Sequence, residues 1–200
     1  VYTPFDFKEN IVLENERVLL RPLLSTDISL LASYVTEEPD LWNYALSSIQ
    51  TKEDLENYIQ AALAARENKT AYAFIVFDKK INAFVGCTRF YDIQLSFQTT
   101  QIGYTWYSKK VWGTRLNENC KFLLLSFAFE QIGIQRVEFR ADYNNKRSIA
   151  AMQKIGCTVE GVLRNHLPLP NGKRRDSIVL SILKIEWENS SKKNLEFRLQ

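Results

Sequence analysis

The sequence is poor in cysteine and histidine, the residues that build most metal and redox sites. Its three cysteines, Cys87, Cys120 and Cys157, lie far apart, and the single histidine completes no Cys/His zinc spacing. No two cysteines form a CxxC motif. We therefore expect no metal cofactor, and we interpret the cysteines as reduced, mostly buried side chains of a cytoplasmic protein.

The chain also lacks long apolar runs and a strong excess of charge of one sign. No run of about 18 apolar residues is present, so no membrane-spanning helix is predicted. The start at Val1 to Pro4 shows no basic and then apolar leader. The net charge of +3 is too small to indicate nucleic acid, which would require a concentrated basic face. We expect neither a membrane nor a nucleic-acid partner.

What is present is the composition of one soluble globular domain. Hydrophobic residues make up 46% of the 200 residues and charged residues 24%, enough for a sizeable core without disulfides. Patterns typical of helices lie in residues 28–35, 55–63, 116–128 and 145–155, and patterns typical of strands in residues 18–20, 71–77, 81–93, 98–107, 136–141, 158–169 and 177–183. This order predicts an α+β fold with a mixed sheet and helices on its faces.

The strongest functional signal is a short loop, Lys110 to Arg115, between a strand-like run at Gln101–Tyr107 and a predicted helix. The start of a helix carries unpaired N–H groups and the positive end of the helix dipole, so it attracts phosphate. A second polar helix start follows at Asn145–Ser148. Two such starts together indicate a long phosphorylated cofactor, and therefore favour an enzyme over a structural protein.

Five segments carry a resemblance to a known family. They are Asn15–Pro22, Gln101–Phe127, Asn145 with Ser148, Lys154–Cys157 and Glu160–Arg164. In this order and spacing they resemble the Gcn5-related N-acetyltransferases (GNAT), and within them the branch of ribosomal-protein N-terminal acetyltransferases. The resemblance covers residues 13–187 as one GNAT domain, with residues 1–12 as an N-terminal extension and residues 188–200 as a polar, loosely ordered C-terminal tail. It implies a single-domain fold with a mostly antiparallel sheet flanked by helices.

The resemblance also implies an activity, the acetyl-CoA-dependent transfer of an acetyl group to a primary amine. In that family the strand before the loop pairs with the pantetheine arm, and the loop and helix start hold the diphosphate. The cofactor-binding residues implied here are Thr105, Trp106, Tyr107, Lys110, Val111, Trp112, Gly113, Thr114, Arg115, Leu116, Asn117, Asn145 and Arg147. Gly103 is the expected place for a disruption of the strand that frees N–H groups for the acetyl carbonyl.

The loop departs from the family pattern, Gln/Arg-x-x-Gly-x-Gly/Ala, at two positions. Lys110 replaces the usual Gln or Arg with another cation, whereas Gly113 matches. Arg115 stands where Gly or Ala lets the backbone approach the diphosphate. We expect its side chain to turn outward and contact phosphate, so that cofactor binding is retained but altered.

Acetyl transfer needs one group that protonates the leaving thiolate and one that takes a proton from the amine. Met152 replaces the tyrosine that many family members use to protonate the leaving thiolate, and the resemblance points instead to Ser148. The alternative is an ordinary serine in a first helical turn, and Asn145 is predicted as the helix cap, a cofactor contact, or both.

Leu167 stands at the position where the branch has its general base. The remaining base candidates are His166, which titrates near neutral pH or is a plain strand residue, and Asp92.

Without an evident base, an α-amine is the easier acceptor, because its pKa of about 7.7–8.0 leaves more of it neutral than a lysine. We therefore expect a small-molecule or peptide amine acceptor and favour a protein N-terminus. The aromatic residues Trp42, Tyr44, Tyr91 and Trp106 suit either an acceptor site or a core.

Two other readings stay open. The first is a non-catalytic acyl-CoA-binding module or sensor, and the second, less favoured, is an RNA- or ribosome-binding adaptor that uses Lys109, Lys110 and Lys173–Arg175. A homodimer that pairs through an exposed edge strand is a further expectation.

Overall fold

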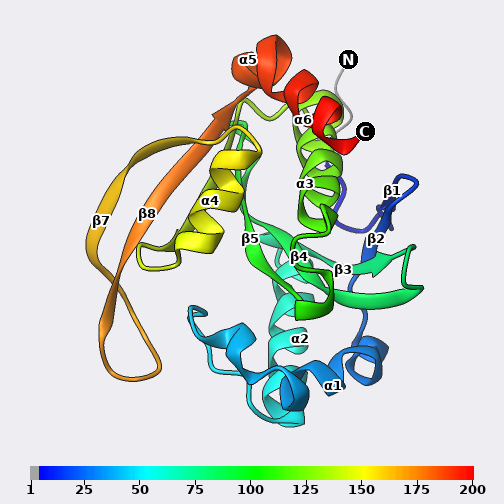
Figure 1. The fold of residues 1–200 in the computed structure, drawn as a ribbon, viewed down its shortest axis with the longest axis vertical. Helices are drawn as coiled ribbons and strands as arrows, with labels where there is room; N and C mark the ends of the chain where they lie inside the picture. The colour runs from blue at the N-terminus through cyan, green and yellow to red at the C-terminus, as the bar shows by residue number, and fades with distance from the viewer. Residues whose placement is uncertain (1–4) are drawn as a thin grey trace.

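The strands of the described residues form one continuous sheet in the order β1-β2-β3-β4-β5-β6-β8-β7 (Figure 1). The structure is a computed structural model that describes residues 5–200. The strands are β1 (Leu13–Glu14), β2 (Val18–Pro22), β3 (Ala71–Asp78), β4 (Ala83–Gln94), β5 (Thr99–Tyr107), β6 (Arg136–Asp142), β7 (Thr158–Pro168) and β8 (Arg174–Leu183). The helices are α1 (Ile28–Glu37), α2 (Lys52–Glu67), α3 (Leu116–Ser126), α4 (Lys146–Lys154), α5 (Lys184–Glu186) and α6 (Lys192–Leu199).

The sheet is mixed but mostly antiparallel. Within residues 5–200, β5 and β6 are the only parallel neighbours, and every other adjacent pair is antiparallel. A parallel pair needs a crossover connection, and here α3 supplies it. The predicted α+β fold, a mostly antiparallel sheet flanked by helices, is confirmed.

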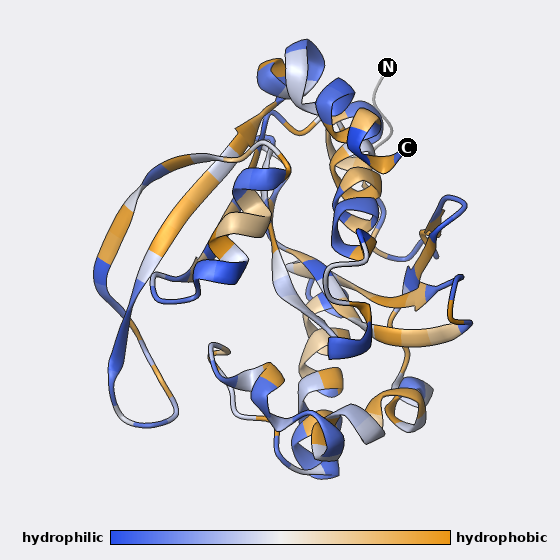
Figure 2. Cartoon of the chain, viewed as in Figure 1, coloured by the Kyte–Doolittle hydropathy of each residue, from blue (hydrophilic) through white to orange (hydrophobic). Residues whose placement is uncertain are grey.

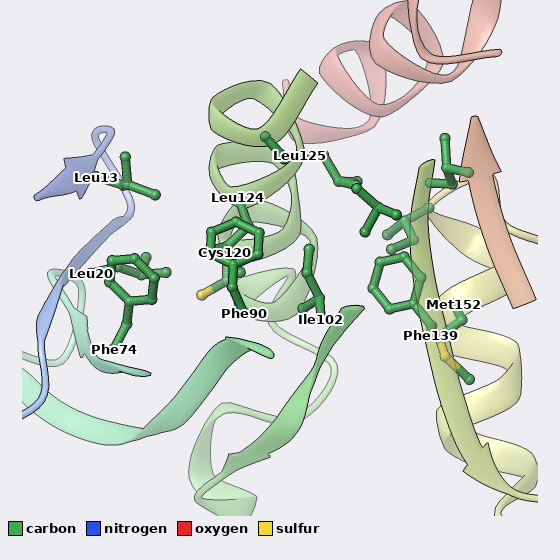
Figure 3. Close-up of a cluster of buried hydrophobic side chains, with 14 of the residues drawn as sticks. Leu13, Leu20, Phe74, Phe90, Ile102, Cys120, Leu124, Leu125, Phe139 and Met152 are labelled. Carbon is green, nitrogen blue, oxygen red and sulfur yellow. The ribbon is translucent and has the colours of Figure 1, made fainter. Parts of the chain in front are cut away.

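Two hydrophobic cores lie on opposite faces of the sheet, because side chains alternate along each strand. On β3, Tyr72 and Phe74 belong to the larger core, and Ala73 and Ile75 to the smaller one. Side chains of β2, β4, β5 and β6 converge with those of α3 and α4 in the larger core (Figure 3). The smaller core is built by α1, α2 and the adjoining loop. Figure 2 shows the hydrophobic residues running along β3, β4 and the upper part of β8.

Local sequence signals explain several of these elements. At the start of α2, the Thr51 hydroxyl accepts from the Asp54 N–H at 3.1 Å, and the Asp54 carboxylate accepts from the Thr51 N–H at 2.9 Å. This capping box is the one that the sequence predicts. Along β6, Val137, Phe139 and Ala141 are buried in the larger core, as the alternation of the strand predicts.

Both chain ends pack more closely than the sequence suggests. Residues 192–199, predicted as part of a loose tail, form α6 instead, with Leu195 only 1% exposed. Trp187, just before them, is fully buried in the larger core. Phe5 and Phe7 of the expected N-terminal extension lie in the same core. The tail prediction is wrong on order because one buried leucine per two turns is too weak a periodic signal to detect.

Three expected absences concern the described residues alone. None of their helices is both long and apolar enough to cross a bilayer. Residues 5–200 hold no grouping of three or more His, Cys, Asp or Glu side chains suited to a metal ion. The three cysteines are free thiols, and all three are buried.

Candidate active site

The site begins where β5 and β6 separate. The two strands pair only over Thr99–Gln101 and Arg136–Glu138. Beyond Gln101 they diverge, so the remaining length of β5 has no strand partner on its β6 side. An extended ligand can add to such an edge as a strand would, through main-chain hydrogen bonds.

A bulge disrupts β5 within this unpaired length. Cys87 of β4 pairs with Trp106 and Arg89 pairs with Gly103, so one residue of β4 lies opposite two of β5, and β5 holds one extra residue. Tyr104 adopts a φ of 50°, in the left-handed region. The expected disruption at Gly103 therefore falls on the next two residues, Tyr104 and Thr105. Such bulges re-aim backbone groups that would otherwise pair.

A buried carboxylate fixes the loop that follows β5. Glu38, the residue that follows α1, is 7% exposed and accepts hydrogen bonds from the Ser108 hydroxyl and the Lys109 N–H, both at 2.6 Å. The Trp112 indole N–H donates to the Tyr107 carbonyl at 2.9 Å. Gly113 has a φ of 74°, and a Cβ placed there would meet nothing within 4 Å. The loop is thus anchored at Ser108 and Lys109, where it leaves β5, and has open space at Gly113.

Arg115 turns the loop into α3 in an unusual conformation for an arginine. Its φ is 64° and its ψ is 9°, and its side chain makes no capping hydrogen bond. Its carbonyl accepts from the Asn119 side chain at 2.9 Å. The first N–H groups of α3 therefore have neither an intrahelical acceptor nor a side-chain cap, which suits an anion.

The Arg115 side chain is exposed and lines a hollow of about 300 Å³ with Lys154, Arg198 and Phe197. This hollow lies between the start of α3, the end of α4 and α6. The predicted outward direction of Arg115 agrees with this position. Arg115 and Arg198 give the hollow positive charge that suits a phosphate-bearing ligand, whereas Lys154 is paired there with Glu118 at 2.8 Å.

The second helix start, that of α4, lies beside the loop. Asn145 caps α4, since its side chain accepts from the Ser148 N–H at 3.1 Å. The Arg147 guanidinium lies 3.3 Å from the centre of the Trp112 ring. Burial lowers the pKa of Arg147. This contact joins α4 to the loop, so the two helix starts do lie together.

The proton-transfer candidates are scattered around this centre. Ser148 lies in the first turn of α4, and Met152, one turn on, is buried in the larger core. The exposed Asp92 accepts from the Gln94 and Gln101 amides at 3.1 and 2.8 Å. Asp92 therefore sits at the end where β5 and β6 still pair, rather than at the bulge.

His166 lies on β7, with Nδ1 3.0 Å from the Ser177 hydroxyl of β8. Its pKa is lowered, first by burial and then by the positive charges of Arg140, Arg175 and Arg174. The imidazole is therefore neutral at pH 7 and able to take up a proton.

Sequence reasoning missed two residues at this site, Glu38 and Lys121. Lys121 is only 4% exposed, on the face of α3 that packs on the sheet. Its ammonium donates to the Thr105 hydroxyl at 2.8 Å and to the Thr88 hydroxyl at 3.2 Å. One signal was available: Lys121 shares the helical phase of Leu124, Leu125 and Ala128, all apolar. A lysine in the apolar phase of a helix departs from the amphipathic pattern, and the sequence alone shows that departure.

Comparison with known proteins agrees with this geometry. The model of the acetyltransferase (GNAT) domain matches residues 17–158, which is well over half of the chain. The protein belongs to the GNAT family. The resemblance seen in the sequence is confirmed, and this GNAT protein is an N-acetyltransferase.

Relatives of the resembled branch are among the matches. A Bacillus subtilis (strain 168) protein provisionally named ribosomal N-acetyltransferase YdaF is 25% identical over 179 residues, covering 87% of this chain and 95% of that protein. The solved structure of a GCN5-related N-acetyltransferase from Brucella melitensis is 23% identical, with a TM-score of 0.87, and covers 100% of this chain and 90% of that one. RimJ of Mycobacterium smegmatis, solved in complex with CoA-disulfide, has a TM-score of 0.79 at 18% identity, covering 94% and 93%. At these identities the two structures show the shared fold.

Proposed function

We propose that this GNAT protein transfers the acetyl group of acetyl-CoA to a primary amine, with a protein N-terminal α-amine as the favoured acceptor. The single observation that carries the proposal is the divergence of β5 from β6 beyond Gln101, beside the uncapped start of α3. This combination offers a free strand edge for an extended arm and N–H groups for a diphosphate. The cytoplasm fits the free, buried cysteines.

The loop and the two helix starts offer the groups that a phosphorylated cofactor needs. Gly113 leaves open space where a phosphate would approach the backbone. The exposed Lys110 and Arg115 lie on either side of Gly113 in the loop and carry positive charge, and Leu116 and Asn117 contribute unpaired N–H groups at the start of α3. Thr105, Trp106 and Tyr107 of the free edge would pair with the extended arm.

Acetyl-CoA supplies an activated thioester. Main-chain N–H groups at the bulge of Tyr104 and Thr105 are the donors for the carbonyl oxygen as it gains negative charge. Ser148 offers a hydroxyl for the sulfur from the start of α4. His166 offers a neutral imidazole that can accept the proton of the amine. The positive charges of the surrounding arginines disfavour the protonated imidazole and so favour release of that proton.

The acceptor is argued from proton chemistry. An α-amine has a pKa of about 7.7–8.0 and a lysine about 10.4, so at neutral pH a far larger share of an α-amine is neutral and reactive. A weak base such as His166 is therefore sufficient for an α-amine. The name of the Bacillus subtilis relative, a ribosomal N-acetyltransferase, supports a protein or peptide acceptor.

Calorimetry with acetyl-CoA is the first test, followed by thiol release with a panel of peptides and small amines and mass spectrometry of the products. We expect saturable binding and acetylation of α-amines ahead of ε-amines. No binding at millimolar acetyl-CoA would overturn the proposal. Binding without thiol release for any amine would favour the non-catalytic acyl-CoA-binding module.

A further inference from the structure

Lys121 is the one lysine among residues 5–200 that the larger core buries almost completely, and it lies at the bulge. Its Nζ is 2.8 Å from the Thr105 hydroxyl and 3.2 Å from the Thr88 hydroxyl, and these two hydroxyls are 2.8 Å apart. An ammonium group has three N–H donors. Two hydroxyl acceptors leave one donor without a partner in the described chain.

The ammonium of Lys121 also has neighbours on both sides of the place where β5 and β6 diverge. Thr88 and Thr105 belong to β4 and β5 on one side. Cys157 follows α4 on the other, and it lies near enough for Lys121 to lower its thiol pKa against the larger upward effect of burial. The Nζ atom therefore lies at the bulge of β5, beside the strand edge where we propose that the thioester end of the cofactor binds.

No carboxylate balances this charge. Lys121 makes no ion pair within residues 5–200. The titratable groups that act on it are the thiols of Cys120, from α3 itself, and Cys157, from the segment before β7. The side chains of β4 and β5 that contact the ammonium, Thr88 and Thr105, end in neutral hydroxyls. A buried cation without a counter-charge is costly, and is best explained by an anion that binds or forms beside it.

We propose that the ammonium group of Lys121 contacts the sulfur of the acyl thioester and gives its proton to the thiolate that leaves. The proposal rests on the proposed function, since it needs acetyl-CoA at the diverging strands. It assigns a proton donor to a chain whose Met152 cannot be one. The hydroxyl of Ser148 is then a second hydrogen-bond donor to the same sulfur.

The step balances in atoms and protons. The neutral amine forms a bond to the acetyl carbon, and the carbon–sulfur bond breaks with both electrons moving to sulfur. The amine nitrogen loses one proton to its base, and the sulfur takes one from Lys121. After CoA leaves, neutral Lys121 regains a proton from solvent, so the net products are an amide and a free thiol.

The acidity of Lys121 fits this role. Burial lowers its pKa from 10.5 to about 8, close to the value of about 8.5 for an ordinary thiol. The group is thus mostly protonated at pH 7, yet proton transfer to a thiolate is nearly balanced in free energy. Activity that needs the ammonium form is lost as the pH rises through about 8.

The test uses bound CoA, so no acceptor needs to be known. The thiolate of CoA absorbs in the ultraviolet, and its pKa in the complex is measured by a pH titration of wild type and of Lys121→Met. We expect wild type to hold bound CoA with a thiol pKa at least one unit lower than Lys121→Met does, a tenfold difference in thiolate-to-thiol ratio. Binding of desulfo-CoA, which lacks the sulfur, should be equal in the two proteins.

Stability and turnover separate a catalytic role from a structural one. Lys121→Met removes a desolvated charge, so its Tm at pH 7 should rise while kcat falls at least tenfold with little change in KM. Lys121→Gln keeps a donor for Thr105 but has no proton to give, and should be as slow. Lys52→Met, at an exposed lysine of α2, is the matched control and should behave as wild type.

Each outcome is decisive for one of the two proposals. If wild type binds no CoA, the proposed function fails. If CoA binds but its thiol titrates alike in wild type and Lys121→Met, the role of Lys121 is refuted while the function stands. Full turnover of Lys121→Gln, or a lower Tm with proportionate loss of activity, would likewise refute it.

Discussion

At the scale of single residues, Arg115 combines a backbone conformation that favours glycine with a positive charge at the start of α3. A left-handed conformation costs an ordinary residue about 1–2 kcal/mol, and glycine avoids most of that cost. The chain keeps arginine there although its backbone is in the glycine-like region. Its exposed guanidinium beside the start of α3 is the physical reason that we infer for its retention.

Arg115→Gly should therefore fold at least as well as wild type and bind acetyl-CoA about two- to fivefold more weakly, the value of one exposed charge on phosphate. Calorimetry at low and high salt checks this, because the loss should shrink as salt rises. Binding that is tenfold tighter would show instead that the arginine obstructs the cofactor.

Other residues could be predicted from the sequence only where their partners lie close by in the chain. Asn145 as a helix cap followed from the sequence, because a cap bonds to an N–H three residues away. Glu38 did not, since its partner loop lies 70 residues further along the chain. Lys121 was missed for the same reason: its two threonine partners come from other elements.

At the scale of elements, the loop after β5 is held by α1. Glu38→Gln should lower the free energy of unfolding by about 1–3 kcal/mol, since an amide N–H₂ cannot accept from Ser108 or Lys109 as a carboxylate does. It should also raise the Kd for acetyl-CoA, because the loop base loosens. Urea unfolding and calorimetry measure the two effects.

The matched control lies next to it. Asp40 pairs with the Lys109 side chain at 2.9 Å, but the carboxylate is 65% exposed. Asp40→Asn should change stability by less than about 1 kcal/mol. Equal effects of the two substitutions would contradict the anchoring role of Glu38.

Helix α6 is the second element whose contribution to the free energy of unfolding can be measured. Leu195→Ala should cost about 2–4 kcal/mol of unfolding free energy, because it leaves a cavity beside the larger core. Phe197→Ala, at a side chain that is 76% exposed on the same helix, should stay within about 0.5 kcal/mol. If both were neutral, α6 would not be an integral part of the fold.

At the scale of the whole molecule, one ion-pair network ties the C-terminal strands together. Glu160 of β7 accepts from Arg136 of β6 and, at 2.7 Å, from the Ser181 hydroxyl of the intervening β8. The bond from Arg136 is the main cause that lowers the pKa of Glu160 from 4.5 to about 2. The network therefore spans three strands of the half of the sheet that lies beyond the diverging pair.

The sign of the pH effect follows from that shift. Glu160 binds protons less readily folded than unfolded, so its contribution is present above about pH 4.5 and is lost as the pH falls toward about 2. Glu160→Gln should flatten the fall in Tm across this window and change little at pH 7, because the pair is partly exposed. An unchanged acid profile would show that other carboxylates dominate acid unfolding.

The sequence by itself determined the order of the main strands and helices, the helix caps, the loop before α3 and the family, because each rests on contacts between near neighbours or on short spaced motifs. Only the tertiary structure decided where β5 leaves β6, what anchors the loop, that the chain end folds as α6, and that Lys121 meets Thr88 and Thr105 without a counter-charge. Those features depend on which surfaces meet when distant segments pack, and no local periodicity encodes that choice.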